Sequence, residues 1–302
     1  MERRRSLRIL LLCSIVSLVP LGDVSYAQVS PAIQRGAYVF HAAGGCSCHT
    51  DVPNKGPLMA GWRALTTPFG VIYSTNITPD LKTGIGQWSD ADFVRAMTQG
   101  IGPHGKRYFP VFPYTSFTRM SAGDLLDLKA YLFSLPPIER PNRAPELRFP
   151  FGWRFGIRFW KWRYFQPGTF QPDASQSPEW NRGAYLATAL GHCAECHTPR
   201  TWLGGLQTSM AYAGAVDGPE GEAAPNITPD ETTGIGRWST PDIVWFLETG
   251  FKPDGDDTQG LMSEQIEHGY RHLKEEDLQA IAAYLQTLKP IQHRIVKPEK
   301  AP

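Results

Sequence analysis

Two short clusters of cysteine and histidine contain the residues of this sequence that are best suited to chemistry. In the second cluster, Cys193, Cys196 and His197 form the pattern C-x-x-C-H. Thiols at this spacing can add across the two vinyl groups of one haem, and the adjacent histidine then lies beneath the iron as its proximal ligand. Zinc also binds Cys and His, but it normally takes a second pair of ligands, and no such pair is nearby in the sequence. The cluster therefore predicts a covalently bound haem c.

The first cluster has the same residue types with one residue fewer between its cysteines, Cys46 and Cys48. Cys48 is still followed directly by His49, so we expect a thioether at Cys48 and an axial bond from His49 to the iron. Cys46 must reach the second vinyl group across a shorter loop or stay unattached. The alternative is that this half of the chain has lost its haem. We predict two haem c groups, the first of them held by one or two thioethers.

The second half of the chain repeats the first half. Residues 30–38 match residues 177–185, and residues 76–92 match residues 226–242. The offset is 147 at the first cysteine of each cluster and 148 at the second, so the missing residue lies inside the first cluster. An internal repeat of this length predicts two similar units in tandem.

The sixth ligand of haem 2, the haem at Cys193 and Cys196, should be a methionine if this haem carries electrons. Ligation by Met and His raises the reduction potential and closes the iron to other ligands. Met262 follows a glycine-rich loop and precedes the last helix, where such a ligand belongs. The alternative is that Met262 fills the core, and His268 and His272 compete with it as ligands.

Haem 1, the haem of the first cluster, needs a different sixth ligand. In the alignment of the two repeats, Met262 corresponds to Phe112, which cannot bind iron. Met120 follows it, directly before the predicted last helix of this half. We predict Met120 as the ligand, ahead of His104 and of an open coordination position.

Each unit is predicted to consist of short helices joined by loops. Four serines have the sequence context of helix N-caps, two before proline and two in capping boxes: Ser30, Ser177, Ser89 and Ser239. Apolar residues at helical spacing predict a closing helix over about 121–135 and its equivalent over about 274–288. Few segments alternate as strands do, so the expected fold class is all-α.

The repeat and the composition divide the chain into five segments. These are a signal peptide over 1–27, a first haem domain over 28–139, a linker over 140–176, a second haem domain over 177–292 and a tail over 293–302. The signal peptide is predicted from four N-terminal arginines, an apolar run too short to span a bilayer and a small-residue cleavage site at Ala27. A retained membrane anchor is the alternative. We therefore expect export to the periplasm.

The linker is rich in proline and in aromatic residues. Trp153, Ile157, Trp160 and Tyr164 fall at helical spacing, and basic residues line another face of that helix. One interpretation is a connector whose rings pack between the two domains. The other is a docking surface for a partner subunit, or a peripheral membrane contact, over residues 149–166.

The haem propionates need polar partners. We predict that Trp88, Trp238 and Arg200 supply them, because a guanidinium pairs well with a carboxylate and an indole can donate its N–H. The repeated Asn-Ile-Thr-Pro-Asp loops at 76–80 and 226–230 have two interpretations. They either bind propionates as well or form structural turns, which their Asn, Pro and Asp residues favour.

The chain resembles the dihaem c-type cytochromes that serve as cytochrome subunits of alcohol, aldehyde and gluconate dehydrogenases. The resembling motifs extend over nearly all of residues 30–290. They are Thr-Pro-Phe-Gly at 67–70, the two Asn-Ile-Thr-Pro-Asp loops, Phe-Pro-Val-Phe-Pro-Tyr at 109–114 and the segment 193–200. Two features depart from the group: many members have Met where Phe112 stands, and the Cys46–Cys48 spacing is short.

The resemblance implies two class I cytochrome c domains in tandem, with cysteine-linked haems, axial His and usually axial Met. It also implies a periplasmic dehydrogenase that supplies electrons, and a downstream cytochrome or membrane oxidase that accepts them. We therefore predict an electron-transfer subunit that is not catalytic alone. The alternatives are a dihaem redox enzyme of the peroxidase or thiosulfate-oxidising type, with an open or weakly ligated haem 1, and a binding module with one haem.

The charge of the chain argues against a nucleic-acid partner. The whole chain has a net charge of +1. Residues 1–27 carry four arginines against two acidic residues, so the remainder has a net charge of about −1. A nucleic-acid-binding domain would carry a strong basic field instead.

Overall fold

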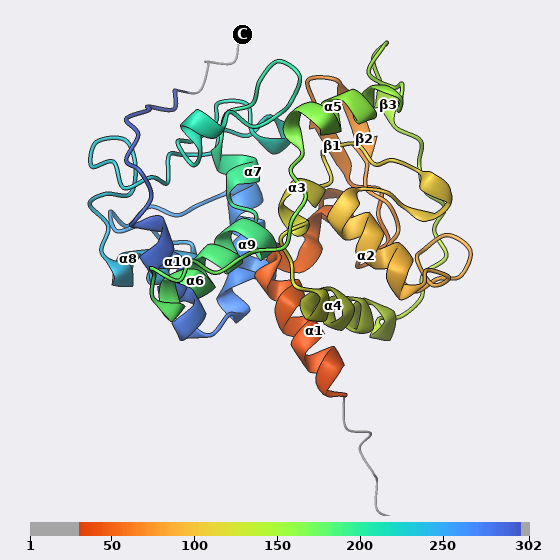
Figure 1. Ribbon diagram of the computed structural model, residues 1–302, viewed down its shortest axis with the longest axis horizontal. Helices are drawn as coiled ribbons and strands as arrows, with labels where there is room; N and C mark the ends of the chain where they lie inside the picture. Colours follow the sequence, from red (N-terminus) through yellow and green to blue (C-terminus); the bar gives the residue numbers. More distant parts are fainter. Residues whose placement is uncertain (1–29, 297–302) are drawn as a thin grey trace, which may run out of the picture.

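The computed structural model describes residues 30–296, and these are mainly helical (Figure 1). The first half contains α1 (Pro31–Ala42), α2 (Asp90–Gln99), α3 (Tyr114–Phe117) and α4 (Ala122–Ser134). The linker contains α5 (Gly156–Tyr164). The second half contains α6 (Pro178–Tyr185), α7 (Ala194–His197), α8 (Thr240–Thr249), α9 (Gly260–His268) and α10 (Glu275–Leu285). The predicted signal peptide lies outside the described residues, and no helix within 30–296 is long and apolar enough to span a bilayer.

The helix starts lie where the serine caps predict them. Ser30 and Ser177 accept hydrogen bonds from backbone amides at 3.3 and 3.0 Å, each with proline at the first helical position. Ser89 and Ser239 form complete capping boxes with the aspartates three residues later. These contacts satisfy amides that no helical carbonyl reaches. The four predicted caps are confirmed.

The first and last helices of each half pack closely at a glycine. In the first half, α1 crosses α4 at Gly36, where a Cβ atom would lie 1.9 Å from the carbonyl oxygen of Asp127. In the second half, α6 crosses α10 at Gly183, where a Cβ atom would lie 1.8 Å from the carbonyl oxygen of Ala280. The two halves therefore share one local architecture, and Figure 1 shows them side by side.

A small sheet adds strands that the all-α prediction did not include. Strands β1 (Ala64–Thr67) and β2 (Gly70–Tyr73) form an antiparallel hairpin, and β3 (Glu146–Leu147) from the linker pairs with β2. Gly70, at φ 123°, allows the close approach of β3, because its Cβ would lie 2.3 Å from the oxygen of Glu146. The strands are too short for their alternation to be visible in the sequence.

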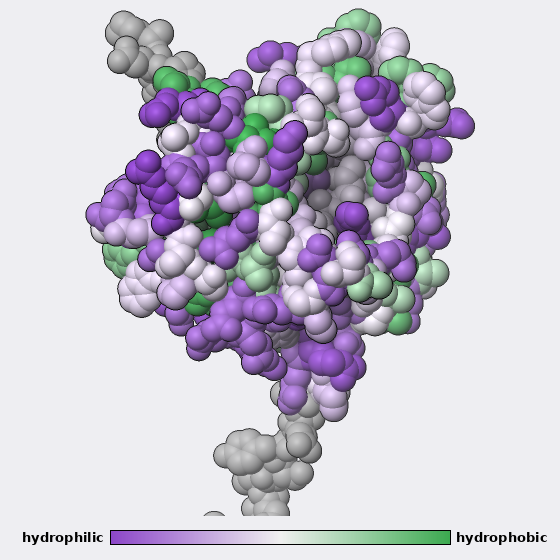
Figure 2. All heavy atoms as spheres, turned by 60° about the vertical axis from the view of Figure 1, so that its left-hand side comes forward, coloured by the Kyte–Doolittle hydropathy of each residue, from purple (hydrophilic) through white to green (hydrophobic). Residues whose placement is uncertain are grey.

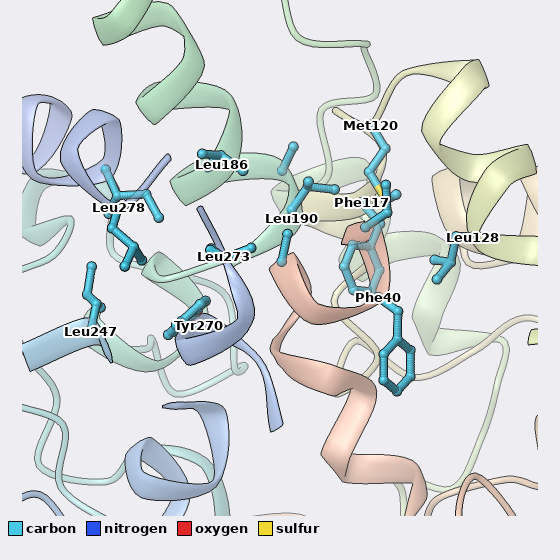
Figure 3. Close-up of a cluster of buried hydrophobic side chains, with 14 of the residues drawn as sticks. Phe40, Phe117, Met120, Leu128, Leu186, Leu190, Leu247, Tyr270, Leu273 and Leu278 are labelled. Carbon is cyan, nitrogen blue, oxygen red and sulfur yellow. The ribbon is translucent and has the colours of Figure 1, made fainter. Parts of the chain in front are cut away.

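One buried apolar cluster extends through both halves (Figure 3). Phe40, Phe117 and Leu128 come from the first half, and Leu190 and Tyr270 come from the second. Because burial of apolar surface is the main favourable term in folding, a shared core couples the two halves energetically.

Reciprocal hydrogen bonds also join the halves along their contact surface, which we call the seam. The hydroxyl of Tyr38 on α1 donates to Asp277 on α10 at 2.5 Å, and the hydroxyl of Tyr185 on α6 donates to Asp124 on α4. The two tyrosines are equivalent in the repeat, and so are the two aspartates. Burial, together with the bond to a carboxylate, raises the pKa of each tyrosine to about 12. Each half therefore gives the other the same contact.

The glycine crossings generate the first prediction. Gly36→Ala should lower the free energy of unfolding by about 1–3 kcal/mol, because the new methyl group overlaps a backbone oxygen and the two helices must separate. Gly123→Ala on α4 is the matched control, since its Cβ would meet nothing closer than 3.8 Å. It should be neutral or stabilise by about 0.5–1 kcal/mol. Urea unfolding of the haem-loaded variants measures both, and equal stabilities would contradict the proposed close packing.

Candidate haem sites

The second cluster lies on a short helical turn that follows α6. The amide of His197 donates to the carbonyl of Cys193 at 3.0 Å, so the two cysteines and the histidine are wound on one turn. Nδ1 of His197 is 2.8 Å from the carbonyl oxygen of Pro225. This contact fixes the tautomer with the proton on Nδ1 and leaves the lone pair of Nε2 for a metal. Burial lowers the pKa of His197, which favours the neutral, ligating form.

The first cluster presents its histidine in the same way. Nδ1 of His49 is 2.7 Å from the carbonyl oxygen of Thr75, and burial lowers the pKa of His49 too. The carbonyl of His49 accepts from the amide of Gly61 at 2.8 Å, as the carbonyl of His197 does from Gly214 at the same distance. The missing residue has therefore not changed the proximal side of the site.

The shortened cluster is wound differently from the complete one. Residues Gly44–His49 form a 3₁₀-helix, whereas Ala194–His197 is an α-helical turn. Two residues of 3₁₀-helix rise about 4 Å, close to the rise of about 4.5 Å for three residues of α-helix. The tighter winding thus recovers most of the axial length that the missing residue would supply between Cys46 and Cys48.

The thiols of Cys48, Cys193 and Cys196 are partly desolvated by the surrounding protein. The side chain of Cys48 keeps an exposed surface, yet burial raises its thiol pKa to about 11. Cys193 and Cys196 are half-buried, and burial raises their thiol pKa values to about 11 and about 12. Accessible but desolvated thiols beside a neutral imidazole are a donor set that fits haem c.

Met262 and Phe112 follow matching loops in the two halves. The loops that lead to them are closed by equivalent bonds, from Tyr108 to the carbonyl of Gly100 and from Thr258 to the carbonyl of Gly250, both at 2.9 Å. Both side chains are partly buried against the shared apolar cluster. The correspondence read from the sequence is thus reproduced in the loops before them.

Met120 lies in the core at a place that the repeat gives to a leucine. Its amide donates to Phe117 at 3.0 Å, as the amide of Leu273 donates to Tyr270. The Met120 side chain is 1 % exposed and lies in the shared cluster (Figure 3). Met120 thus packs in the core as Leu273 does, and its role as an iron ligand stays a prediction.

The competing histidines have other environments. His104 is exposed in a turn, with φ 57°. The carbonyl of His268 accepts from Nδ1 of His41 at 2.8 Å, and the ring of His272 stacks on His41 with centroids 4.4 Å apart. His268 and His272 therefore take part in the seam.

The predicted propionate partners differ in how far they are already bonded. Trp88 and Trp238 are half-buried, and within residues 30–296 neither indole N–H has a protein acceptor. Arg200 is engaged: its Nη2 lies 2.7 Å from Oε2 of Glu195 and its Nη1 donates to the carbonyl of Gly204 at 2.8 Å. The indole N–H groups of Trp88 and Trp238 can therefore donate to a propionate. The guanidinium of Arg200 already donates to Glu195 and Gly204.

The two Asn-Ile-Thr-Pro-Asp loops are structural turns. The side-chain oxygen of Asn76 accepts from the amide and the hydroxyl of Thr78 at 2.9 and 2.7 Å, and its amide group donates to Ile138 at 2.7 Å. Asn226 makes the same three contacts at the same distances with Thr228 and with Ile291. Each loop thereby ties down the chain that follows the closing helix, and its asparagine is satisfied without a propionate.

Each attachment loop touches the other half of the chain. Glu195, between the two cysteines of the second cluster, accepts from Thr115 at 2.5 Å and from Ser116 at 3.2 Å. Ser47, between the two cysteines of the first cluster, accepts from Gln265 on α9 at 3.0 Å. The repeat could have drawn attention to these polar residues inside the clusters, but it could not assign their partners.

The two attachment sites consequently face one another across the seam. A negative charge on Cys48 contributes to the raised pKa of Cys196, after the larger effect of burial, so these two thiols lie close enough to interact electrostatically. Nearby, the buried Arg63 of the first half contacts Glu220 at 2.8 Å and Glu264 at 2.5 Å in the second half. Glu264 is on α9, the helix of Met262, so this ion cluster anchors α9 to the first half.

Comparison with known proteins agrees with this geometry. No family model matches the chain. It is 39% identical over 271 residues to the "Diheme cytochrome c-type" protein of Cereibacter sphaeroides, a match that covers 88% of this chain and 89% of that protein. It is 40% identical to a nicotinate dehydrogenase subunit of Pseudomonas putida over 91% of this chain, and 38% identical to the "Fructose dehydrogenase cytochrome subunit" of Gluconobacter japonicus over 85%.

The matches differ in how much of each relative they cover. The chain spans 23% of the nicotinate dehydrogenase subunit and 53% of the fructose dehydrogenase subunit. In contrast, it matches nearly the full length of the Cereibacter sphaeroides protein. That match, the paired cysteine clusters and the two identically oriented histidines lead to one conclusion: this chain belongs to the dihaem c-type cytochromes and binds two haem c groups.

Proposed function

We propose that this protein carries electrons from a periplasmic dehydrogenase to a downstream cytochrome or membrane oxidase. The observation that carries the proposal is the approach of the two attachment sites across the seam, since it gives electrons a short route between the haems. Relatives named as cytochrome subunits of fructose, gluconate and alcohol dehydrogenases support a dehydrogenase as the donor. They do not favour the alternative of an independent peroxidase-type or thiosulfate-oxidising enzyme.

The chain is proposed to hold its haems in two class I cytochrome c domains, over residues 28–139 and 177–292, joined by the linker. Haem supplies reversible one-electron chemistry when bound. Cys48, Cys193 and Cys196 would hold it covalently, with Cys46 as a second attachment point for haem 1. His49 and His197 would present Nε2 to the iron from a neutral ring. The carbonyl partner of each Nδ1 fixes that ring in place.

The two haems should differ in potential because their distal sides differ. Met262 would supply a thioether sulfur to haem 2, and a Met ligand raises the potential of a His-ligated haem. Phe112 supplies none at the matching place on haem 1. Electrons would therefore pass from haem 1 to haem 2, and the indoles of Trp88 and Trp238 would contact the propionates.

The donor can be identified by recovering the protein from its native periplasm. Affinity purification of the tagged, haem-loaded chain should retain a dehydrogenase, and addition of that enzyme's substrate should reduce both haems in the visible spectrum. The control is the same preparation without substrate. If no dehydrogenase is retained, or if only one haem is reduced, transfer through both haems is wrong.

A pair of methionine variants tests the distal ligands. Met262→Leu should remove the sulfur-to-iron charge-transfer band of the oxidised protein and lower the higher of two midpoint potentials, because the iron loses its thioether. Met120→Leu is the matched variant in the first half, and we expect its spectrum and potentials to stay unchanged because Leu273 fills the equivalent place. A lost band in Met120→Leu would restore Met120 as the ligand of haem 1.

The attachment of haem 1 is tested by cysteine variants and intact mass. Cys48→Ala should release haem 1, leaving a mass equal to the chain plus one haem, because the cysteine next to His49 carries the expected thioether. Cys46→Ala should retain two haems. If the Cys46→Ala change also leaves the reduced α band unshifted, haem 1 has one thioether; a shift would show that Cys46 forms the second. Release of haem 1 by Cys46→Ala, with retention in Cys48→Ala, would contradict the assignment.

A further inference from the structure

Helix α5 packs one face against the protein and exposes the other. On the inner face, Ile157 is buried and the indole N–H of Trp160 donates to the carbonyl of Leu203 at 3.0 Å. The outer face carries three bulky rings at the spacing i, i+4, i+7, which places them on one side of a helix. They are Phe155, Phe159 and Trp162, with 80, 59 and 77 % of their surface exposed. The inner face therefore packs as the connector interpretation predicts, whereas the outer face is exposed to solvent.

The segment before the helix continues this aromatic surface. Phe149, Phe151 and Trp153 are 79, 40 and 66 % exposed. Figure 1 shows β3 and α5 together at one edge of the molecule. We call these six exposed side chains the aromatic surface. The face drawn in Figure 2 shows apolar residues mostly scattered among hydrophilic ones. Clustered exposed rings of this size mark an interaction site.

The charge around the aromatic surface has one sign. Residues 148–172 contain five Lys or Arg and no Asp or Glu. Lys106 and Arg107 join this group, because Arg154 donates to the carbonyl of Arg107. Burial is the larger cause of the lowered pKa values of Lys106 and Lys161. The positive charge of Arg154 lowers the pKa of Lys106 further, and the positive charge of Arg107 lowers that of Lys161. Within residues 30–296, none of these seven cations has an acidic partner in an ion pair.

We propose that the aromatic surface docks this cytochrome on an anionic lipid bilayer. A short helix with large rings on one face and cations beside them lies in the plane of the headgroups, with the rings reaching the acyl boundary. The rings protrude in contacting pairs, Phe149 with Trp153 and Phe159 with Trp162, with centroids 5.2 and 5.6 Å apart. A deformable bilayer accepts such protruding rings without a matching set of pockets. The uncompensated cations would meet lipid phosphates, and the exposed Arg158 and Arg163 flank the aromatic face.

Sedimentation with vesicles tests this docking on the haem-loaded protein. Vesicles of phosphatidylglycerol mixed with phosphatidylcholine should bind the protein at low salt, and vesicles of phosphatidylcholine alone should bind it much more weakly. R158Q/R163Q should lower the partition coefficient roughly 30-fold, since each cation near the surface contributes roughly fivefold. F155S/F159S/W162S should lower it by at least roughly tenfold, because the apolar contact is lost.

Trp245→Ser on α8 is the matched control, since Trp245 is 54 % exposed but lies outside the aromatic surface. Its partition should equal that of the unchanged protein. All variants alter exposed side chains, and an unchanged haem spectrum confirms that each is folded. The proposal is overturned if the unchanged protein stays in the supernatant, or if F155S/F159S/W162S binds vesicles as well as Trp245→Ser does. Loss of the native dehydrogenase by that triple variant, with vesicle binding intact, would assign the surface to a protein partner instead.

Discussion

The seam between the two halves is the constraint on which both haem sites depend. Tyr38 and Tyr185 each donate to an aspartate in the first turn of the other half's closing helix. A hydrogen bond to a carboxylate in partly buried surroundings is stronger than one between neutral groups. Because the same contact occurs twice, the two halves are held together at two equivalent positions. This fixes the position of one attachment loop relative to the other.

The two halves are consequently not independent haem domains that are joined only by a linker. Glu195 is buried, and its carboxylate is satisfied by Thr115 and Ser116 of the first half together with Arg200 of its own. A second half on its own would lose two of these donors, and with them the contacts that hold Glu195 and the attachment loop in place. The first half depends on the second in the same way, because both carboxylate partners of the buried Arg63 come from the second half.

Sequence reasoning succeeded where the structure is set by neighbouring residues. The caps at Ser30, Ser89, Ser177 and Ser239 and the closing helices are local features, and the structure has them as predicted. The β1–β2 hairpin was missed because each strand has only four residues, and β3 was missed because Gly70 pairs with Leu147, far away in the chain, over only two residues. The seam was missed because a repeat shows what two units share but not which surfaces they turn to each other. The predicted propionate contact of Arg200 did not consider Glu195, a carboxylate five residues away that Arg200 contacts at 2.7 Å.

The two attachment sites differ because the first cluster compensates for its missing residue in the segment before the histidine. A deletion inside a helix that carries ligands would normally rotate everything beyond it, His49 included. Here the 3₁₀ winding of Gly44–His49 takes up the change before the histidine, and the bond from His49 to Thr75 is as short as that from His197 to Pro225. The histidine contacts are thereby the same in both halves, and the two sites differ in the spacing of their cysteines and in having Phe112 where the other half has Met262.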